Sequence, residues 1–265
     1  MTAAILPRHF VEKPWGQAGL PAHFGGREEK VGEIWFDRPE EPLPLLCKWL
    51  FTSEKLSVQV HPSDEQAQAR GLASGKEECW IVTATEGDAR LGIGLTQQLS
   101  DEELREASLS GAIEDMLDWK TVAPGDWYYI PAGTIHAIGA GVQLVEIQQN
   151  ADITYRLYDY GRPRELHLDD GVAVSRPAPY SGNCGTSPTS PGLHRLVASP
   201  YFTIDRVIGE VDLSRQPEGD CYCIPVAGEF EISGQIFEPG EVALCPVSEI
   251  QPKSGSCDLL IAQAV

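Results

Sequence analysis

The sequence predicts an all-β protein, a sandwich or barrel that is interrupted by one helical insertion. Twenty-six glycines and 20 prolines divide the chain into short segments. Many of these segments alternate apolar with polar residues and are rich in β-branched or aromatic side chains, which is typical of strands. Helical patterns do not alternate regularly with them, so a parallel sheet built from strand–helix–strand units is not expected.

Seven segments are the clearest strand candidates because each is short, β-rich and bounded by turn residues. In chain order they are residues 34–36, 45–51, 56–60, 78–84, 127–130, 142–146 and 155–158. Between them, Ser100 and Glu103 form a capping box that predicts the start of a helix. The apolar residues that follow are spaced to form one stripe, namely Leu104, Leu109, Ile113 and Leu117. We therefore expect a helical insertion around residues 100–119.

The composition changes in one segment, residues 176–192 (RPAPYSGNCGTSPTSPG), where Pro, Ser, Gly, Thr and Asn dominate. This segment is too poor in apolar residues to form core, and we interpret it as a linker. It divides the chain into a first domain, residues 1–175, which contains the helical insertion, and a smaller C-terminal β domain, residues 193–265.

The charge balance excludes some classes of partner. The chain has 39 acidic and 20 basic residues, a formal net charge of −19. Such a field repels nucleic acid and anionic membrane surfaces, so neither is an expected partner, and an anionic ligand requires a local basic pocket. Pro7, Arg8 and His9 stand where a signal peptide would have its apolar core, and we expect a cytoplasmic location. Seven cysteines without a CxxC motif indicate neither a disulfide framework nor a thiolate zinc site.

The segment GDWYYIPAGTIH, residues 125–136, is the most informative part of the sequence. A glycine turn, a short strand and a Pro-x-Gly turn would present His136 at a fixed place on the next strand. Upstream, Gln59 and His61 are two residues apart, so both side chains point to the same face of a strand. Glu78 follows in GKEECW. One Gln, one Glu and two His residues would form a site of oxygen and nitrogen ligands, suited to zinc or another first-row divalent ion.

The spacing G-x5-P-x-G-x2-H in that segment resembles the second signature of the cupin superfamily, although Ala140 stands where Asn is often found. Three further strings are VEKPWG (11–16), KWLFTSEKLSVQVHP (48–62) and LVEIQQNADITYRLYDYGR (144–162). Together they resemble the type I mannose-6-phosphate isomerases over about residues 10–164, in their short bacterial form. The resemblance implies a cupin, a jelly-roll β-barrel, with a second, smaller cupin-like domain that lacks the metal.

The resemblance also implies an activity and a ligand set. The activity would be a zinc-dependent aldose–ketose isomerisation that interconverts mannose 6-phosphate and fructose 6-phosphate. One zinc ion per chain would be held by Gln59, His61, Glu78 and His136. The phosphate would meet Ser57 and Lys76, with Lys48 on the preceding strand, since a hydroxyl and an ammonium suit a phosphate monoester.

For catalysis, the resemblance places Arg156 in the active site. Moving a hydrogen between C1 and C2 by an enediol route builds negative charge on the sugar oxygens, which a guanidinium and a metal can stabilise. Glu146, Asp152 and a metal-bound hydroxide are alternative bases for the C2 proton. Arg162 either holds the phosphate or pairs with a nearby acid.

Two residues of the family motifs, Trp15 and Glu33, either line the sugar pocket or serve in barrel packing and a salt bridge. A second function remains open: a non-catalytic metal-binding cupin that acts as a sugar-phosphate sensor or binding protein. The presence of all four ligands and Arg156 favours the enzyme. We expect a monomer, with a dimer left open, whose partner is a small sugar phosphate.

Overall fold

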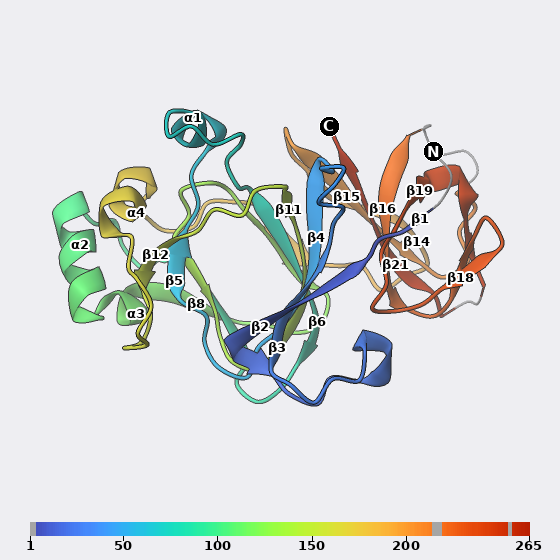
Figure 1. Cartoon of the computed structure of the whole chain (residues 1–265), viewed down its shortest axis with the longest axis horizontal. Coiled ribbons are helices and arrows are strands. Elements are labelled where there is room, and N and C mark those ends of the chain that lie inside the picture. Colours follow the sequence, from blue (N-terminus) through green and yellow to red (C-terminus); the bar gives the residue numbers. More distant parts are fainter. Residues whose placement is uncertain (1–3, 214–218, 254–255) are drawn as a thin grey trace.

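Two antiparallel sheets face each other and form the first barrel (Figure 1). The structure, a computed structural model, describes residues 4–213, 219–253 and 256–265, so the expected domain start at residue 1 lies outside them. Within these ranges the larger sheet has seven strands, in the order β13 (Cys184–Thr186), β9 (Asp126–Ile130), β6 (Glu78–Thr85), β11 (Val142–Gln149), β4 (Leu45–Phe51), β3 (Val31–Phe36) and β2 (Arg8–Gln17). The other has five, in the described residues: β12 (Tyr155–Tyr158), β5 (Val58–Val60), β10 (His136–Ile138), β7 (Arg90–Leu95) and β8 (Leu117–Thr121). The all-β prediction is confirmed, and every predicted strand overlaps an observed one.

The inner strand β4 of the seven-stranded sheet is buried on both faces, and its sequence shows how this is achieved. Every residue of β4 is buried. Because side chains alternate between the two faces of a sheet, Cys47, Trp49 and Phe51 pack on one side, in an apolar core shared with the C-terminal part of the chain. Lys48 and Leu50 point the other way, into the first barrel. One strand therefore separates an apolar core from a polar cavity.

The C-terminal domain is a second, smaller β structure that packs on the outer face of the seven-stranded sheet (Figure 1, right). Its main sheet has, in the described residues, the order β1 (Ala4–Ile5), β19 (Ala243–Pro246), β16 (Asp220–Ala227), β21 (Asp258–Ala264), β15 (Phe202–Ile208) and β14 (Gly192–Ala198). A small sheet follows the order β18 (Gln235–Phe237), β17 (Phe230–Ile232) and β20 (Ile250–Pro252). Between the two sheets lies a second apolar core.

The hydroxyl of Tyr222, on β16, links the C-terminal domain to the first barrel. It donates a hydrogen bond to the Leu45 carbonyl at 3.0 Å and accepts one from the Leu45 N–H at 3.1 Å. Both groups are buried at the start of β4, so the hydroxyl satisfies a donor and an acceptor that have lost contact with water.

Helices cover the outer face of the five-stranded sheet, where α2 (Asp101–Ser110), α3 (Ile113–Met116) and α4 (Leu168–Val174) share one apolar core with it (Figure 1, left). The remaining helical elements are α1 (Asp64–Gln68), η1 (Ala22–Phe24) and η2 (Val247–Glu249). In the part of the chain that the structure describes, no helix is both long and apolar enough to cross a membrane.

The helical insertion begins where the sequence predicts it. Ser100 Oγ accepts from the Glu103 N–H, and the Glu103 carboxylate accepts from the Ser100 N–H at 2.7 Å. The predicted stripe is wrong at Leu109, which is 65% exposed, whereas Leu104 is buried. The reason is that Leu104 and Leu109 stand five residues apart, which at 3.6 residues per turn is about 140° around the helix, so they cannot share one face. Beyond Ser110, where α2 ends at the left-handed Gly111 (φ 84°), the stripe does not continue in phase.

The segment 176–192, which composition predicts to be a linker, lies along the first barrel. Its β13 pairs with β9. The Ala178 carbonyl accepts from the Leu95 N–H at the five-stranded sheet, and the Asn183 carbonyl accepts from the Tyr129 N–H at the seven-stranded sheet. A segment rich in Pro and Gly can therefore be ordered by backbone hydrogen bonds rather than by an apolar core of its own.

The N-terminal end of the described chain pairs with the C-terminal domain. Ala4 and Ile5 form β1, which pairs with β19 of the C-terminal domain, and the Leu6 N–H donates to the Val242 carbonyl at 2.8 Å. Residues 4–6 therefore belong to the C-terminal sheet although they are predicted in the first domain. Backbone pairing between distant segments leaves no local pattern in a sequence, which is why composition did not indicate it.

Candidate active site

Two rows of side chains face each other across the interior of the first barrel. In the five-stranded sheet, β5 lies between β12 and β10, so Gln59 pairs with Arg156 on one side and with His136 on the other. In the seven-stranded sheet, Lys48 is aligned with Glu146, and Glu146 with Trp80. Antiparallel partners in register present their side chains to the same face. Strand register alone thus brings residues far apart in the sequence into one site.

His61, Glu78 and His136 meet at one end of this interior and form what we call the metal cluster. All three are at most 1% exposed. Their potential ligand atoms lie within 4.8 Å of one another. Nε2 of His136 is 3.5 Å from Glu78 Oε1, and Nε2 of His61 is 3.6 Å from Glu78 Oε2. Among the described residues, the C-terminal domain contains no comparable group of His, Cys, Asp or Glu side chains.

Both histidines of the metal cluster are oriented by backbone carbonyls. Nδ1 of His61 lies 2.7 Å from the Ile153 carbonyl oxygen, and Nδ1 of His136 lies 2.8 Å from that of Thr134. A carbonyl only accepts, so each Nδ1 donates and each Nε2 keeps a lone pair that points toward Glu78. Burial lowers the pKa of both imidazoles, that of His136 to about 4. Both rings are therefore neutral at pH 7, the form that binds a metal.

Glu78 has the properties of a metal ligand. Its two carboxylate oxygens are buried and accept no hydrogen bond from any described residue, although the Lys76 ammonium lies 2.8 Å from Oε2. Burial alone would raise the pKa of Glu78, but Lys76 and the two imidazoles lower it well below its usual range. A buried, ionised carboxylate with unsatisfied oxygens between two Nε2 atoms fits a divalent cation.

Gln59 lies beside the metal cluster. Its Nε2 is 3.3 Å from His136 Nε2, and its Oε1 accepts from the Ser57 hydroxyl at 3.2 Å. A half-turn of the amide exchanges oxygen and nitrogen with little change of shape, and it would bring the oxygen beside His136. The structure therefore brings all four predicted metal ligands together.

Two glycines allow the loops that carry these residues to approach closely. At Gly75 a Cβ atom would lie 2.4 Å from the Pro62 carbonyl oxygen, so only glycine lets the segment before Lys76 and Glu78 pack against the one after His61. Gly133 has a φ of 82°, a conformation that favours glycine, and its N–H donates to the His61 carbonyl at 2.8 Å. The Pro-x-Gly turn, which precedes the strand of His136, is thereby attached to His61, the residue directly after β5.

Glu146 is the centre of a buried ion-pair network. Its Oε1 accepts from the Lys48 ammonium at 2.9 Å and lies 3.7 Å from the Lys76 ammonium. Its Oε2 accepts from the Trp80 indole N–H at 3.0 Å. Burial and Glu78 raise the pKa of Glu146, but the two lysines outweigh them and lower it. Both oxygens of this carboxylate are engaged.

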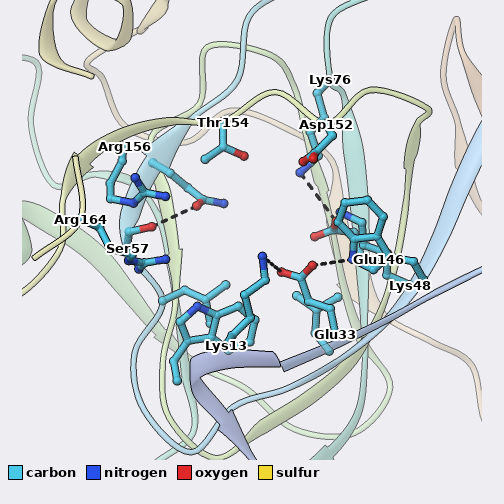
Figure 2. A pocket seen from close by; sticks show the side chains of 15 residues that line it. Lys13, Glu33, Lys48, Ser57, Lys76, Glu146, Asp152, Thr154, Arg156 and Arg164 are labelled. Carbon is cyan, nitrogen blue, oxygen red and sulfur yellow. Dashed lines mark hydrogen bonds and ion pairs between the residues drawn. The ribbon is translucent and has the colours of Figure 1, made fainter. Parts of the chain in front are cut away.

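An open cavity of about 150 Å³ lies between the two sheets. Most predicted site residues line it, namely Trp15, Glu33, Lys48, Ser57, Gln59, Lys76, Glu146, Asp152 and Arg156. Figure 2 shows Lys48, Lys76 and Glu146 on one wall, and Ser57, Arg156 and Arg164 on the opposite wall. A cavity of this size with a charged lining suits a small polar molecule rather than a polymer.

Arg162 does not line the cavity. It donates to the Lys55 carbonyl at 2.6 Å and forms an ion pair with Asp159 at 3.0 Å. Of the two interpretations of Arg162, pairing with a nearby acid matches this geometry. Asp152 lies exposed on the cavity lining, and its carboxylate has no hydrogen bond or ion pair to a described residue.

Besides Leu50 and Leu56, four cavity residues with polar or aromatic side chains were not singled out from the sequence: Lys13, Trp35, Thr154 and Arg164. Three of them stand two positions from a predicted residue, Lys13 from Trp15, Trp35 from Glu33, and Thr154 from Arg156. Because alternate residues of a strand share one face, the positions of Lys13 and Trp35 could have indicated that they line the same cavity as Trp15 and Glu33. Arg164 follows a turn, where that period does not apply.

Comparison with known proteins identifies relatives of this chain. No family model matches it. ManA of Bacillus subtilis strain 168, a mannose-6-phosphate isomerase, is 44% identical over 150 residues, which cover 54% of this chain and 46% of ManA. The chain spans about half the length of the first three curated relatives that it matches.

Similarity over most of the chain extends to a further relative and to solved structures. "Putative mannose-6-phosphate isomerase YvyI" of Bacillus subtilis is 33% identical over 266 residues, 83% of this chain and 84% of YvyI. The crystal structure of the mannose 6-phosphate isomerase from Bacillus subtilis matches with a TM-score of 0.82 and 27% identity, over 99% of this chain and 100% of that one. A zinc-bound mannose 6-phosphate isomerase, 16% identical, shares the fold at a TM-score of 0.72 over the full length of both chains. This chain belongs to the mannose-6-phosphate isomerase family.

Proposed function

We propose that this protein is a zinc-dependent isomerase that interconverts mannose 6-phosphate and fructose 6-phosphate. The observation that carries the proposal is the metal cluster, in which two Nε2 lone pairs and two unsatisfied carboxylate oxygens converge beside a charged cavity. Family membership supplies the reaction. Zinc fits the donor set of two imidazoles, a carboxylate and an amide oxygen, and a zinc-bound isomerase shares this fold.

The proposed ligands are Gln59, His61, Glu78 and His136. When bound, the metal supplies Lewis-acid polarisation of the sugar oxygens at C1 and C2. Arg156 stands in register with Gln59 and lines the cavity, so its guanidinium can stabilise negative charge that develops on those oxygens. The Arg156 N–H donates to His167 Nδ1, which fixes the backbone of Arg156.

Of the two candidate carboxylate bases, Asp152 is the better placed to move a proton. Its carboxylate lines the cavity and is free of partners among the described residues. Glu146 is already held by Lys48, Lys76 and Trp80, so its role is to fix the two lysines at the metal side of the cavity. Such fixed charges need no reorganisation during the reaction.

The remaining cavity residues bind and orient the substrate in this proposal. Trp15 and Glu33 line the cavity near Lys13, which lies 3.7 Å from Glu33 Oε1. Ser57 offers its hydroxyl, and Lys48 and Lys76 contribute positive potential. We propose a monomer that acts in the cytoplasm on a small sugar phosphate, without nucleic-acid or membrane partners.

The test is a coupled assay of fructose 6-phosphate formation from mannose 6-phosphate. Zinc-loaded protein is assayed with and without a chelator, beside His136→Ala and Arg156→Ala. We expect His136→Ala to lose its zinc and, with it, about a thousandfold or more in activity. Arg156→Ala should keep zinc and lose about a hundred- to a thousandfold in turnover. His194→Ala, in the C-terminal domain, is the matched control and should equal wild type.

The assay separates the enzyme from the sensor function. Turnover that the chelator abolishes and zinc restores would support the isomerase. Wild-type protein that binds zinc with the expected ligands but produces no fructose 6-phosphate would refute it. A largely active Arg156→Ala would remove Arg156 from the catalytic residues.

A further inference from the structure

The lysines on the metal side of the cavity are already paired with carboxylates. The Lys76 ammonium lies 2.8 Å from Glu78 and 3.7 Å from Glu146, and the Lys48 ammonium lies 2.9 Å from Glu146. This wall therefore has little unpaired positive charge for a doubly charged anion.

The opposite wall includes a guanidinium, that of Arg156, with no ion pair to a described residue. Arg156 and Arg164 lie there beside Ser57 (Figure 2). The Arg156 guanidinium donates to the Glu165 carbonyl at 2.7 Å, while its buried Nε has no hydrogen-bond partner among the described residues. Burial and the neighbouring Arg164 charge lower the pKa of Arg156. Two guanidiniums that repel each other beside an open cavity indicate an anion site.

Arg164 is held in this position by a buried acid. Asp159 is 2% exposed, and its two oxygens accept from Nε and NH2 of Arg164, each at 2.6 Å. Such a bidentate contact fixes the plane of the guanidinium. Tyr160 (φ 54°) and Gly161 (φ 78°) turn the chain back after Asp159, so that Arg164 returns to it.

Arg162 binds the same carboxylate from the other side but has a different role. Its ion pair with Asp159 and its hydrogen bond to the Lys55 carbonyl tie the turn to the segment that leads into Ser57. Asp159 thus balances one of the two guanidiniums that it binds, and together with Arg156 these side chains keep about two positive charges. A phosphate monoester carries between one and a half and two negative charges at pH 7.

We propose that Arg164 binds the phosphate of the sugar phosphate together with Arg156 and the Ser57 hydroxyl, and that Asp159 is the positioning residue for Arg164. The inference rests on the proposed function and deepens it. The phosphate then lies on the wall opposite Lys76, and the reacting end of the sugar extends across the cavity to the metal cluster.

The test measures binding of sorbitol 6-phosphate to zinc-loaded protein by calorimetry, because this hexitol phosphate has no carbonyl and cannot isomerise. KM and kcat for mannose 6-phosphate are measured in parallel. Arg164→Ala should weaken sorbitol 6-phosphate binding about tenfold or more, which is typical for loss of one charge-assisted contact. KM should rise by a similar factor, while kcat changes less than about threefold.

Asp159→Asn tests positioning. It should weaken binding in the same direction, and combined with Arg164→Ala it should add little, because the two residues act through one contact. The matched controls are Arg206→Ala and Asp258→Asn, which break a bidentate pair of the same kind in the C-terminal domain and should leave binding unchanged.

Each outcome decides the proposal. Wild-type protein that does not bind sorbitol 6-phosphate, or Arg164→Ala that binds it within about twofold of wild type, would overturn the role of Arg164. If the losses in binding free energy of Arg164→Ala and Asp159→Asn were fully additive in the double variant, the positioning role of Asp159 would be overturned. If Asp159→Asn fails to fold, Arg164→Ala alone decides. If wild-type protein binds sorbitol 6-phosphate but does not turn over mannose 6-phosphate, the proposed isomerase function is refuted. The comparison of Arg164→Ala with wild type would still decide whether Arg164 binds the phosphate.

Discussion

The interiors of the two β structures differ in chemistry, although each lies between antiparallel sheets. The first barrel encloses buried charges, among them Lys48, Lys76, Glu78 and Glu146, none more than 5% exposed. The interior of the C-terminal domain contains aliphatic and aromatic side chains and thiols, such as Phe230, Phe237, Cys221 and Cys223. Facing antiparallel sheets can therefore enclose either buried charged groups or apolar side chains.

The difference shows what a polar interior requires. Burying an ion costs several kcal/mol unless a partner of opposite charge and hydrogen bonds compensate for it. In the first barrel, Glu146 has two lysines and an indole N–H, and Glu78 has the Lys76 ammonium. The charges are mutually dependent, whereas residues of the C-terminal core can be changed one at a time.

Within the two interiors, the largest effect on stability should come from Lys48→Met, which removes the closest partner of Glu146. We expect a loss of about 3 kcal/mol in the free energy of unfolding, because a buried carboxylate loses part of its compensation. Urea denaturation measures it. Cys223→Ala in the other interior is the comparison and should cost about 1 kcal/mol, since it removes one small apolar group. Equal losses in both variants would contradict the distinction between the two interiors.

An intermediate effect should follow Tyr222→Phe, at the boundary between the two structures. The variant leaves the Leu45 N–H and carbonyl without their partner, so the expected loss is about 1–3 kcal/mol, measured by the same denaturation. Tyr158→Phe, on a half-buried tyrosine, is the control and should cost less. A neutral Tyr222→Phe would mean that the boundary depends on apolar packing alone.

The smallest effect should come from Leu109→Gln, outside both interiors. Because Leu109 is largely exposed, we expect a change within about 0.5 kcal/mol. Leu104→Ala on the same helix should cost about 2–5 kcal/mol, because Leu104 is buried. A large loss of stability for Leu109→Gln would indicate that Leu109 is buried, as the predicted apolar stripe requires. It would contradict the observed orientation of the helix, in which Leu109 faces solvent.

The sequence predicts the strands and the metal cluster well, because both depend on short-range spacing. Gln59 lies on β5 and His61 directly follows that strand, and the Pro-x-Gly turn presents His136, so motif order was sufficient to identify the four proposed ligands. Arg162 and Arg164 are the counterexample. They stand two positions apart in the sequence, yet after the left-handed turn at Tyr160 and Gly161 only Arg164 lines the cavity. A turn's dihedral angles depend on tertiary contacts that spacing does not encode.

Two backbone contacts near the predicted domain boundaries are a related case. The segment 176–192 has the composition of a linker, but its backbone hydrogen-bonds to both sheets of the first barrel. Ala4 and Ile5 pair with a strand more than two hundred residues later. Neither contact involves a side-chain pattern, so neither was visible in the sequence.

The placement of β21 has a consequence for folding during synthesis. This strand follows the other described strands in the chain, yet it lies inside its sheet, between β16 and β15. The apolar face of Cys47, Trp49 and Phe51 is thus fully covered only after β21 has left the ribosome. About 100 residues separate β12 from β21, so at about 5–20 residues per second this face stays incompletely covered for roughly 5–20 s. Chaperone binding to nascent chains should therefore be strongest between the emergence of β12 and that of β21.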